Sequence, residues 1–484
     1  MTSQLPDELW LEIFSRLPRE TTLNLYQTHR RFRRILCARV FARFSFHPYT
    51  AKPHHQGAVL LLPPKRIERA LERLAFGASP EVAPLVRLVN VEPYPPDHPS
   101  SSEASATDEQ YLLLFELYER LVHFTCLQNL SCTNIRLTQT FFSSLCRLPE
   151  LVTLSVADSN PLLGHHTDYS SSKLHKLRAL VVSGYSPMDG RDYSEWIPLL
   201  RPEFLTELQL QLLPHRIPEI GPSFPTSQTS KQAVDIRRIL PKFPALHILT
   251  VIDNAMELSL KRNVPDHRDT IPVFLPPLTE YTGPIWTLRT FLCLPTLTHL
   301  AIGFVSAPEL LTELQSIGAQ STVTSLWVSV VSFTNPLLIA LCDFFPALTR
   351  LRVEVRDYQD TGEQKIDVFL DSLAKSTPLP PHLTQLALAW STRQTDMKSP
   401  IYPKFRQELT ARYPAVDAVW LCFYNGMLLW RKTPDRDEQI IENAFEATDG
   451  FLAVQKKVGI MRSTFDYTWG EIKSNNSQIV QSTI

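Results

Sequence analysis

A short hydrophobic pattern recurs along most of the chain. Its clearest copy is Phe345–Val355, in which Leu351, Val353 and Val355 alternate with charged residues. Such alternation is typical of a β-strand with one buried face. Pro346 lacks an N–H and disfavours helix at the residue before it, so an upstream helix is expected to stop there. The pattern therefore predicts a repeating unit of helix, proline stop and short strand.

Copies of this pattern continue from Pro84 to Leu421. Where no insertion intervenes, their central apolar positions lie 24 to 28 residues apart, which is the period of leucine-rich repeats. Helical patterns precede most copies, and a helix that returns to a parallel strand is the layout of a leucine-rich horseshoe. We therefore expect an α/β fold, an irregular horseshoe with parallel strands inside and helices outside. An ordinary α/β domain with parallel strands is the alternative, and the constant leucine spacing favours the horseshoe.

The repeat region departs from a regular array in two ways. Asn254 occupies the place of the asparagine that follows the strand in standard repeats, but Val305 and Val331 stand there in other copies. We therefore expect no continuous asparagine ladder. Insertions rich in proline, serine or charge also widen some gaps, and the first of them has a composition typical of disorder. These insertions are residues 93–109, 214–232 and 262–284.

Residues 5–46 carry a different pattern, which predicts three short helices. Proline and acidic residues at positions 6–8 suit the first turn of a helix, and Pro18 ends it. Three helices in about forty residues form a very small core, and such modules often gain stability from a partner. The apolar residues of the first helix recur at intervals of three or four: Leu9, Trp10, Ile13, Phe14 and Leu17.

The N-terminal pattern resembles an F-box. F-boxes are the modules by which substrate receptors dock onto the adaptor subunit of cullin–RING (SCF) ubiquitin ligases. One departure is Gln27-Thr28-His29, where many members have a small residue, Val and Cys. The run Arg43–Tyr49 resembles F-box proteins common in filamentous fungi. The matching residues are Leu5-Pro6-x-Glu8-Leu9, Ile13-Phe14, Leu17, Leu23-x-Leu25 and Phe32-Arg33-x-Ile35.

The resemblance implies a function and a set of docking residues. It implies a substrate-recognition subunit whose partners are the adaptor and cullin of an SCF ligase, with an unknown protein substrate held on the repeat arc. Trp10 and Phe14 either dock or pack inside. A scaffold acting outside ubiquitination, an enzyme with an unrecognised site and a mere three-helix cap are the alternatives. The implied adaptor-binding residues are Leu5, Pro6, Leu9, Trp10, Ile13, Phe14 and Leu17.

Six arginines cluster on the third predicted helix and just after it. A solvated helix face is one interpretation, attraction to an acidic partner is a second, and nuclear targeting or nucleic-acid contact is a third. The cluster consists of Arg30, Arg31, Arg33, Arg34, Arg39 and Arg43.

One candidate substrate-binding patch lies in the repeats. The strand alternation directs Leu351 and Val353 to the core and the charged residues between them to the concave side. A tryptophan one repeat earlier would lie beside two arginines, which is the composition of a binding hot spot. A tryptophan covered by a neighbouring loop is the alternative. The patch consists of Trp327, Arg350, Arg352, Glu354 and Gln385.

Composition narrows the function further. The net charge of −1 gives no reason to expect nucleic acid or an anionic membrane as a partner. No nucleotide-binding, serine-hydrolase or zinc-protease motif appears, and the adjacent pairs His54-His55 and His165-His166 cannot both serve one metal from a regular strand. We expect no catalytic site, metal or cofactor.

The chain also lacks secretory and membrane signals. Asp7, Glu8 and Glu12 stand where a signal peptide would be basic and then apolar, and no run reaches the 18 apolar residues of a membrane span. Seven cysteines without a Cys-x-x-Cys pair fit buried thiols in a reducing compartment. We expect a cytoplasmic or nuclear protein.

The expected domains are four. Residues 1–50 form the F-box, 51–80 a proline-rich linker with a short helix, 81–430 the repeat domain, and 431–484 a C-terminal cap with a frayed tail.

Overall fold

The structure is a computed structural model. It falls into two compact units, residues 1–208 with 215–245 and residues 209–214 with 246–484. The residues that it describes are 5–15, 17, 19–51, 59–60, 62–94, 111–157, 159, 174, 176–185, 200–212, 240–253, 274–331, 335–355, 364–375, 378–390, 401–423, 426–433 and 436–443.

The first unit begins with the three predicted helices. They are α1 (Asp7–Ser15), α2 (Arg19–Thr28) and α3 (Arg30–Val40). The side chain of His29 caps α3 by accepting a hydrogen bond from the Arg31 N–H. The small core of these helices consists of Phe14, Ile35 and Leu36, with Trp10, Leu17, Leu25, Tyr26, Phe32 and Val40 packed around it.

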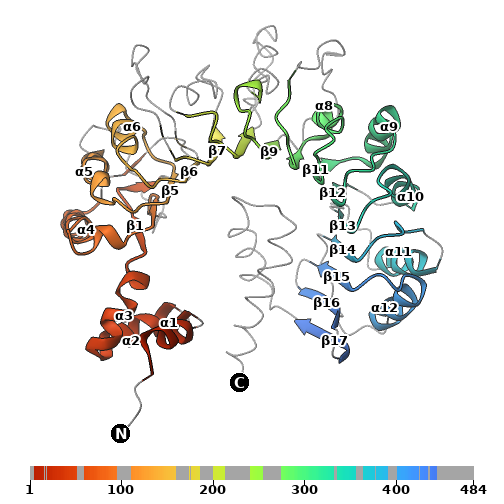
Figure 1. Cartoon of the computed structure of the whole chain (residues 1–484), viewed down its shortest axis with the longest axis horizontal. Coiled ribbons are helices and arrows are strands. Elements are labelled where there is room, and N and C mark those ends of the chain that lie inside the picture. The colour runs from red at the N-terminus through yellow and green to blue at the C-terminus, as the bar shows by residue number, and fades with distance from the viewer. Residues whose placement is uncertain are drawn as a thin grey trace. The chain divides into compact units, whose positions relative to one another are not determined.

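A parallel sheet follows the helices in the first unit. Its order along the chain is also its order in space, with β1 next to β4 and then β5, β6 and β7. The helices α4, α5 and α6 lie on one side of these strands (Figure 1). The strands are β1 (Arg43–Phe46), β4 (Leu88–Val91), β5 (Asn129–Thr133), β6 (Thr153–Ala157) and β7 (Ala179–Tyr185). Strand β8 (Glu207–Leu212) begins in this unit, and its residues from Gln209 onward belong to the second. The helices are α4 (Pro64–Gly77), η1 (Ala83–Leu85), α5 (Leu112–Arg120), η3 (Leu121–His123) and α6 (Gln139–Leu145), and β2 (Thr50–Ala51) pairs with β3 (Val59–Leu60).

The second unit continues the same repeat. Its strands β9 to β15 are parallel and paired in chain order, and β16 and β17 then add two antiparallel strands. The strands are β9 (Ile248–Asp253), β10 (Glu280–Gly283), β11 (His299–Val305), β12 (Ser325–Val330), β13 (Arg350–Val355), β14 (Gln385–Trp390), β15 (Ala418–Phe423), β16 (Gly426–Thr433) and β17 (Arg436–Asn443). The helices are η7 (Leu240–Lys242) in the first unit and η9 (Ile285–Thr287), α8 (Leu288–Phe291), α9 (Ala307–Ile317), α10 (Asn335–Phe344), α11 (Gln364–Lys375) and α12 (Ile401–Arg412) in the second.

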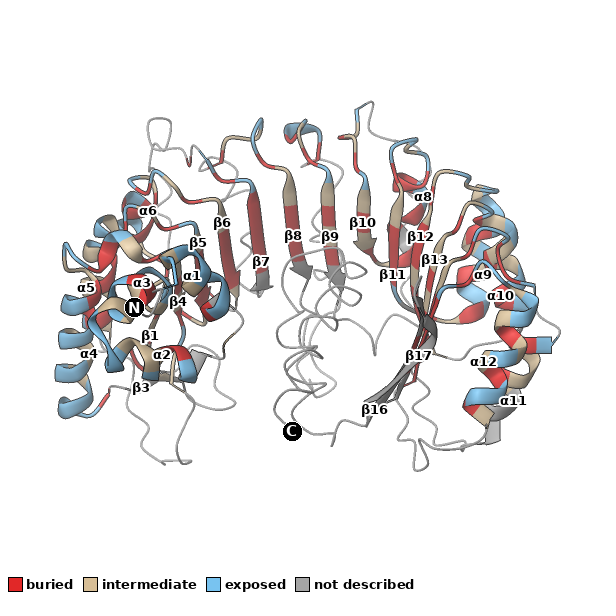
Figure 2. Cartoon of the chain, turned by 60° about the horizontal axis from the view of Figure 1, so that its bottom comes forward, coloured by how far each residue is buried: buried red, intermediate tan, exposed pale blue. Residues whose placement is uncertain are grey.

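The leucine pattern explains the packing of these strands. Leu300, Leu326, Leu351 and Leu386 are aligned in register across four neighbouring strands, and all are buried. In Figure 2 the buried residues lie along successive strands of the sheet. Helix α10 ends at Phe344, directly before the Phe345-Pro346 stop. The predicted fold, three helices followed by leucine-rich-repeat-like parallel strands with helices outside them, is confirmed.

Threonines form a ladder where the strands of the second unit begin. The hydroxyls of Thr324, Thr349 and Thr384 each donate to the carbonyl oxygen of the threonine one repeat earlier, over 3.1–3.3 Å. The same carbonyls accept backbone N–H groups; for example, Thr298 accepts from the Thr324 N–H over 2.9 Å. This ladder joins successive repeats. Asn254, the asparagine noted in the sequence, lies outside the described residues.

The sheet begins earlier in the chain than the pattern indicated. Strand β1 lies within residues assigned to the F-box, and it pairs in register with β4. Phe44 and Phe46 are buried, so this strand belongs to the core of the repeats. Helix α4, in the segment expected to be a linker, packs against β1. The first repeat is therefore built from residues on both sides of the proline-rich segment.

Several expected features fall outside the described residues. They include residues 95–109 and 214–232, residues 262–273 of the third expected insertion, and the C-terminal residues 444–484. The rest of the third insertion is described and contains strand β10, so the expectation of an insertion over 262–284 was wrong for its second half. Of the expected cap, the structure describes β17 and part of β16.

Candidate docking surface of the N-terminal helices

One edge of α1 presents apolar side chains to solvent. Leu9 and Ile13 are one helical turn apart and are 44% and 43% exposed, and Leu5, just before the helix, is 41% exposed. Pro6 beside Leu5 is also exposed. A contiguous apolar edge on so small a module is typical of a surface that a partner covers. We call Leu5, Pro6, Leu9 and Ile13 the apolar edge.

Two other apolar residues of α1, Trp10 and Phe14, face the other helices. Phe14 is 1% exposed and packs inside the module. Its ring centroid lies 5.3 Å from that of Trp10 and 5.1 Å from that of Phe32, and Trp10 and Phe32 are 5.0 Å apart. Leu17 packs against the same core. These three aromatic rings, the aromatic triad, fasten α1 to α3.

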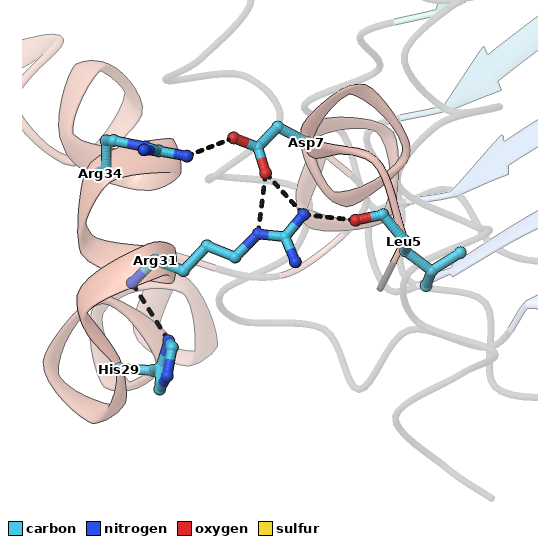
Figure 3. Close-up of polar contacts among 5 residues, drawn as sticks. All are labelled: Leu5, Asp7, His29, Arg31 and Arg34. Atoms are coloured by element: carbon cyan, nitrogen blue, oxygen red, sulfur yellow. Dashed lines mark hydrogen bonds and ion pairs between the residues drawn. The ribbon is translucent and has the colours of Figure 1, made fainter. Parts of the chain in front are cut away.

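Charged groups make a second link between α1 and α3 (Figure 3). Asp7 accepts hydrogen bonds from Arg31 Nε and from Arg34 Nη2, each over 2.8 Å. The guanidinium of Arg31 also donates to the carbonyl oxygen of Leu5. The hydrogen bonds from Arg31 and then Arg34 lower the pKa of Asp7. We call the contacts of Arg31 with Asp7 and Leu5 the N-terminal clamp.

Other arginines of the cluster also bind within the module. Arg39 donates to the carbonyl oxygens of Phe14 and Leu17, the latter over 3.2 Å. The guanidinium carbon of Arg33 lies 5.6 Å from the centroid of the Tyr26 ring. A purely solvated helix face therefore does not describe this cluster, because several of its members connect α3 to α1 and α2.

The candidate substrate patch is brought together on three neighbouring strands. Trp327 on β12 is paired in register with Arg352 on β13, whose guanidinium carbon is 4.7 Å from the centroid of the indole ring. Arg350 is paired in the same way with Gln385 on β14. Glu354 lies further along β13. All five side chains are half-buried on the sheet face opposite Leu351 and Val353.

Several polar atoms around this patch are buried without a hydrogen-bond partner among the described residues. They are Trp327 Nε1, Gln385 Oε1 and the hydroxyl oxygens of Ser325 and Ser329. Buried polar groups are usually satisfied, so a group of them on adjacent strands indicates a place where water or a bound partner supplies contacts.

The described residues show no metal-binding cluster of three or more His, Cys, Asp or Glu side chains. The two histidine pairs lie outside these residues. Nor does the described part of the chain contain a helix long and apolar enough to cross a bilayer.

Sequence reasoning missed two features of this module. It assigned Asp7 only to the helix terminus, although Arg31 and Arg34, spaced by three residues on α3, offer one face to a single carboxylate. It also passed over Leu11, which is exposed on α1 but points away from Leu9 and Ile13 by the helical period.

Comparison with known proteins agrees with this geometry at the N-terminus. No curated protein matches the chain. Among solved structures, an internalin (InlF) of Listeria monocytogenes matches with 14% sequence identity and a TM-score of 0.25, over 75% of this chain and 89% of the internalin chain. Residues 2–47, which contain α1, α2 and α3, match the F-box-like family.

Proposed function

We propose that the protein is the substrate-recognition subunit of an SCF-type cullin–RING ubiquitin ligase. The observation that carries the proposal is the exposed apolar edge on a module that matches the F-box-like family. Leu5, Pro6, Leu9 and Ile13 dock onto the adaptor, and burying such side chains supplies most of the affinity. Trp10, Phe14 and Leu17 support this edge from behind, since they pack in or against the core of the module.

The repeat strands bind a protein substrate in this proposal. Trp327, Arg350, Arg352, Glu354 and Gln385 are the proposed contact residues, because they lie together with unsatisfied polar atoms on one sheet face. A half-buried tryptophan stacked with an arginine is the composition of an interface hot spot. Proximity labelling in the source cell can identify the substrate.

The chain itself carries out no covalent chemistry in this role. It brings a substrate close to the ubiquitin-charged subunit of the complex, and proximity of this kind is its contribution to the rate. The same proposal places the protein in the cytoplasm or nucleus, where SCF ligases act. The resemblance of residues 43–49 to filamentous-fungal F-box proteins supports membership of that group.

Co-purification tests the docking surface. The double variant Leu9→Glu, Ile13→Glu puts two charges on the apolar edge, so we expect the full-length protein to lose the adaptor. Leu11→Glu is the matched control, because Leu11 is equally exposed on α1 but lies on another face. We expect it to retain the adaptor as the wild type does.

The same experiment separates the competing functions. Wild type that retains neither adaptor nor cullin contradicts the proposal. Adaptor without cullin supports the scaffold acting outside ubiquitination instead. For the substrate patch, Trp327→Ala should remove proteins captured by the wild type, whereas Asn90→Ala, at the equivalent strand position of β4, should not.

A further inference from the structure

Leu5 and Pro6 are the two residues of the apolar edge that lie outside a helix. They precede α1, which begins at Asp7. The Pro6 carbonyl oxygen accepts the Trp10 N–H over 3.3 Å, and the Leu5 carbonyl oxygen accepts a hydrogen bond from the Arg31 side chain. A residue on α3, far along the chain, thus holds the first residue of the proposed docking surface.

We infer that the N-terminal clamp is a positioning device for docking. Arg31, held by Asp7, fixes Leu5 in the place where it completes the apolar edge, and adaptor affinity depends on Arg31 through Leu5. This inference rests on the proposed adaptor-binding function.

The geometry of Arg31 suits this role better than that of its neighbours. Its side chain is 24% exposed, against 76% for Arg34. Both arginines bind Asp7, but the hydrogen bond to the Leu5 carbonyl comes from Arg31. Arg30 is exposed at the start of α3 and has the same charge. The three arginines therefore have the same charge and lie on the same helix, but of the three it is Arg31 that bonds the Leu5 carbonyl.

The clamp contributes little to folding itself. Asp7, Arg31 and Arg34 lie at the surface, and surface ion pairs add little to stability. The aromatic triad joins α1 to α3 independently of these charges. Loss of the clamp should therefore leave the module folded but free Leu5, while the Pro6 carbonyl still accepts the Trp10 N–H.

A freed segment must be ordered again on docking. Fixing the backbone of one residue costs enough conformational entropy to weaken binding roughly tenfold. Holding the segment beforehand removes that loss, which is the general advantage of preorganisation. The expected effect of losing the clamp is thus a roughly tenfold rise in the Kd for the adaptor.

The test compares three full-length variants that each remove one positive charge, namely Arg31→Gln, Arg34→Gln and Arg30→Gln. Their affinity for purified adaptor is measured by calorimetry, and the mobility of the Leu5 backbone is followed in the free proteins by 15N relaxation of the Leu5 amide. We expect Arg31→Gln to weaken binding roughly tenfold and to lower the order parameter of Leu5, with an unchanged Tm. Arg30→Gln should match the wild type, and Arg34→Gln should change the Kd by less than about threefold.

A double-mutant cycle gives the sharpest outcome. If Arg31 acts through Leu5, then adding Arg31→Gln to a Leu5→Ala protein should weaken binding much less than adding it to the wild type. Equal losses from all three arginine variants would show simple charge attraction to the adaptor and would overturn the inference. So would an Arg31→Gln protein in which Leu5 is as rigid as in the wild type. A wild-type protein that does not bind the adaptor would instead overturn the proposed function.

Discussion

Gly283 shows how closely single residues are packed in the second unit. It lies in β10 next to the buried ring of Tyr281, which packs at a tilt against Phe291 with ring centroids 4.2 Å apart and hydrogen-bonds Thr287. A methyl group at Gly283 would overlap the Tyr281 hydroxyl. The absence of a side chain at this position is therefore part of the packing.

Gly283→Ala should destabilise the protein by about 1–3 kcal/mol, because the tyrosine must leave a well-packed site. Gly303→Ala is the control, since a methyl group there would meet the Gly283 carbonyl oxygen at an ordinary 3.6 Å. Chemical denaturation followed by fluorescence measures both. Equal stability of the two variants would contradict this account of the packing.

The cysteines should differ widely in reactivity. Burial raises the pKa of the Cys132 thiol well above its usual range, that of Cys342 to about 12 and that of Cys146 to about 11. Thiolates are the reactive form, so these three cysteines should resist alkylation at pH 8. Cys293 is exposed and should react first.

Alkylation with iodoacetamide followed by peptide mass spectrometry gives the order of labelling. In denaturant all the cysteines should react at similar rates. Rapid labelling of Cys132 in the native protein would show that its surroundings open readily, contrary to its full burial on β5.

At the scale of residues, the sequence allowed some side chains to be placed and left others undecided. The alternation of β13 correctly placed Leu351 and Val353 in the core and Trp327 beside Arg352, because strand geometry fixes both. The sequence could not show whether Phe14 contacts the adaptor or packs inside the module, because that depends on how α3 lies against α1. The contact of Asp7 with Arg31 depends on the same tertiary arrangement.

At the scale of elements, the threonine ladder gives the repeats a polar seam. Each hydroxyl joins one repeat to the next at the start of a strand, where the carbonyl already accepts backbone N–H groups. In the sequence the ladder appears as a threonine directly after the first apolar residue of several copies. The sequence alone does not show that these threonines bond one another, because that depends on how neighbouring strands are aligned.

Thr349→Val should lower the free energy of unfolding by about 0.5–1.5 kcal/mol, the usual net value of one such hydrogen bond. The matched control is Thr312→Val, whose hydroxyl bonds the Pro308 carbonyl within the exposed face of α9. Thermal unfolding of both proteins tests the difference. A larger loss at Thr312 would place the stabilising role outside the ladder.

Element prediction failed most clearly at β1. Most strands were evident because the leucine pattern marks them, although β10 lies in a segment expected to be an insertion. Strand β1 has four residues and two buried phenylalanines, and it follows directly on a helix that belongs to the F-box pattern. A local pattern could not reveal that its partner lies 45 residues later, beyond α4.

At the scale of the whole molecule, strand β1 follows the N-terminal helices in the chain and belongs to the first repeat. Val40 ends α3 and Arg43 begins β1, so only two residues separate the docking module from the sheet. Phe44 packs on Phe124 with ring centroids 5.6 Å apart and approaches Gly77 of α4.

Two truncations should therefore behave differently. A chain that begins at Phe41 keeps β1 and should remain monomeric and folded. A chain that begins at Pro48 loses two buried phenylalanines, each worth about 3–5 kcal/mol in a core, and should aggregate. Size-exclusion chromatography with light scattering distinguishes these outcomes, and a chain beginning at Pro48 that stays monomeric and folded would show that β1 is dispensable.

The position of β1 also affects how this protein can be studied genetically. An allele that deletes residues 2–47, the segment matching the F-box-like family, would remove β1 as well. Its phenotype would combine lost docking with a damaged repeat domain, and a substrate that accumulates could not be assigned to either. Alleles with single replacements on the apolar edge keep the sheet intact, so they can separate the two effects in a cell.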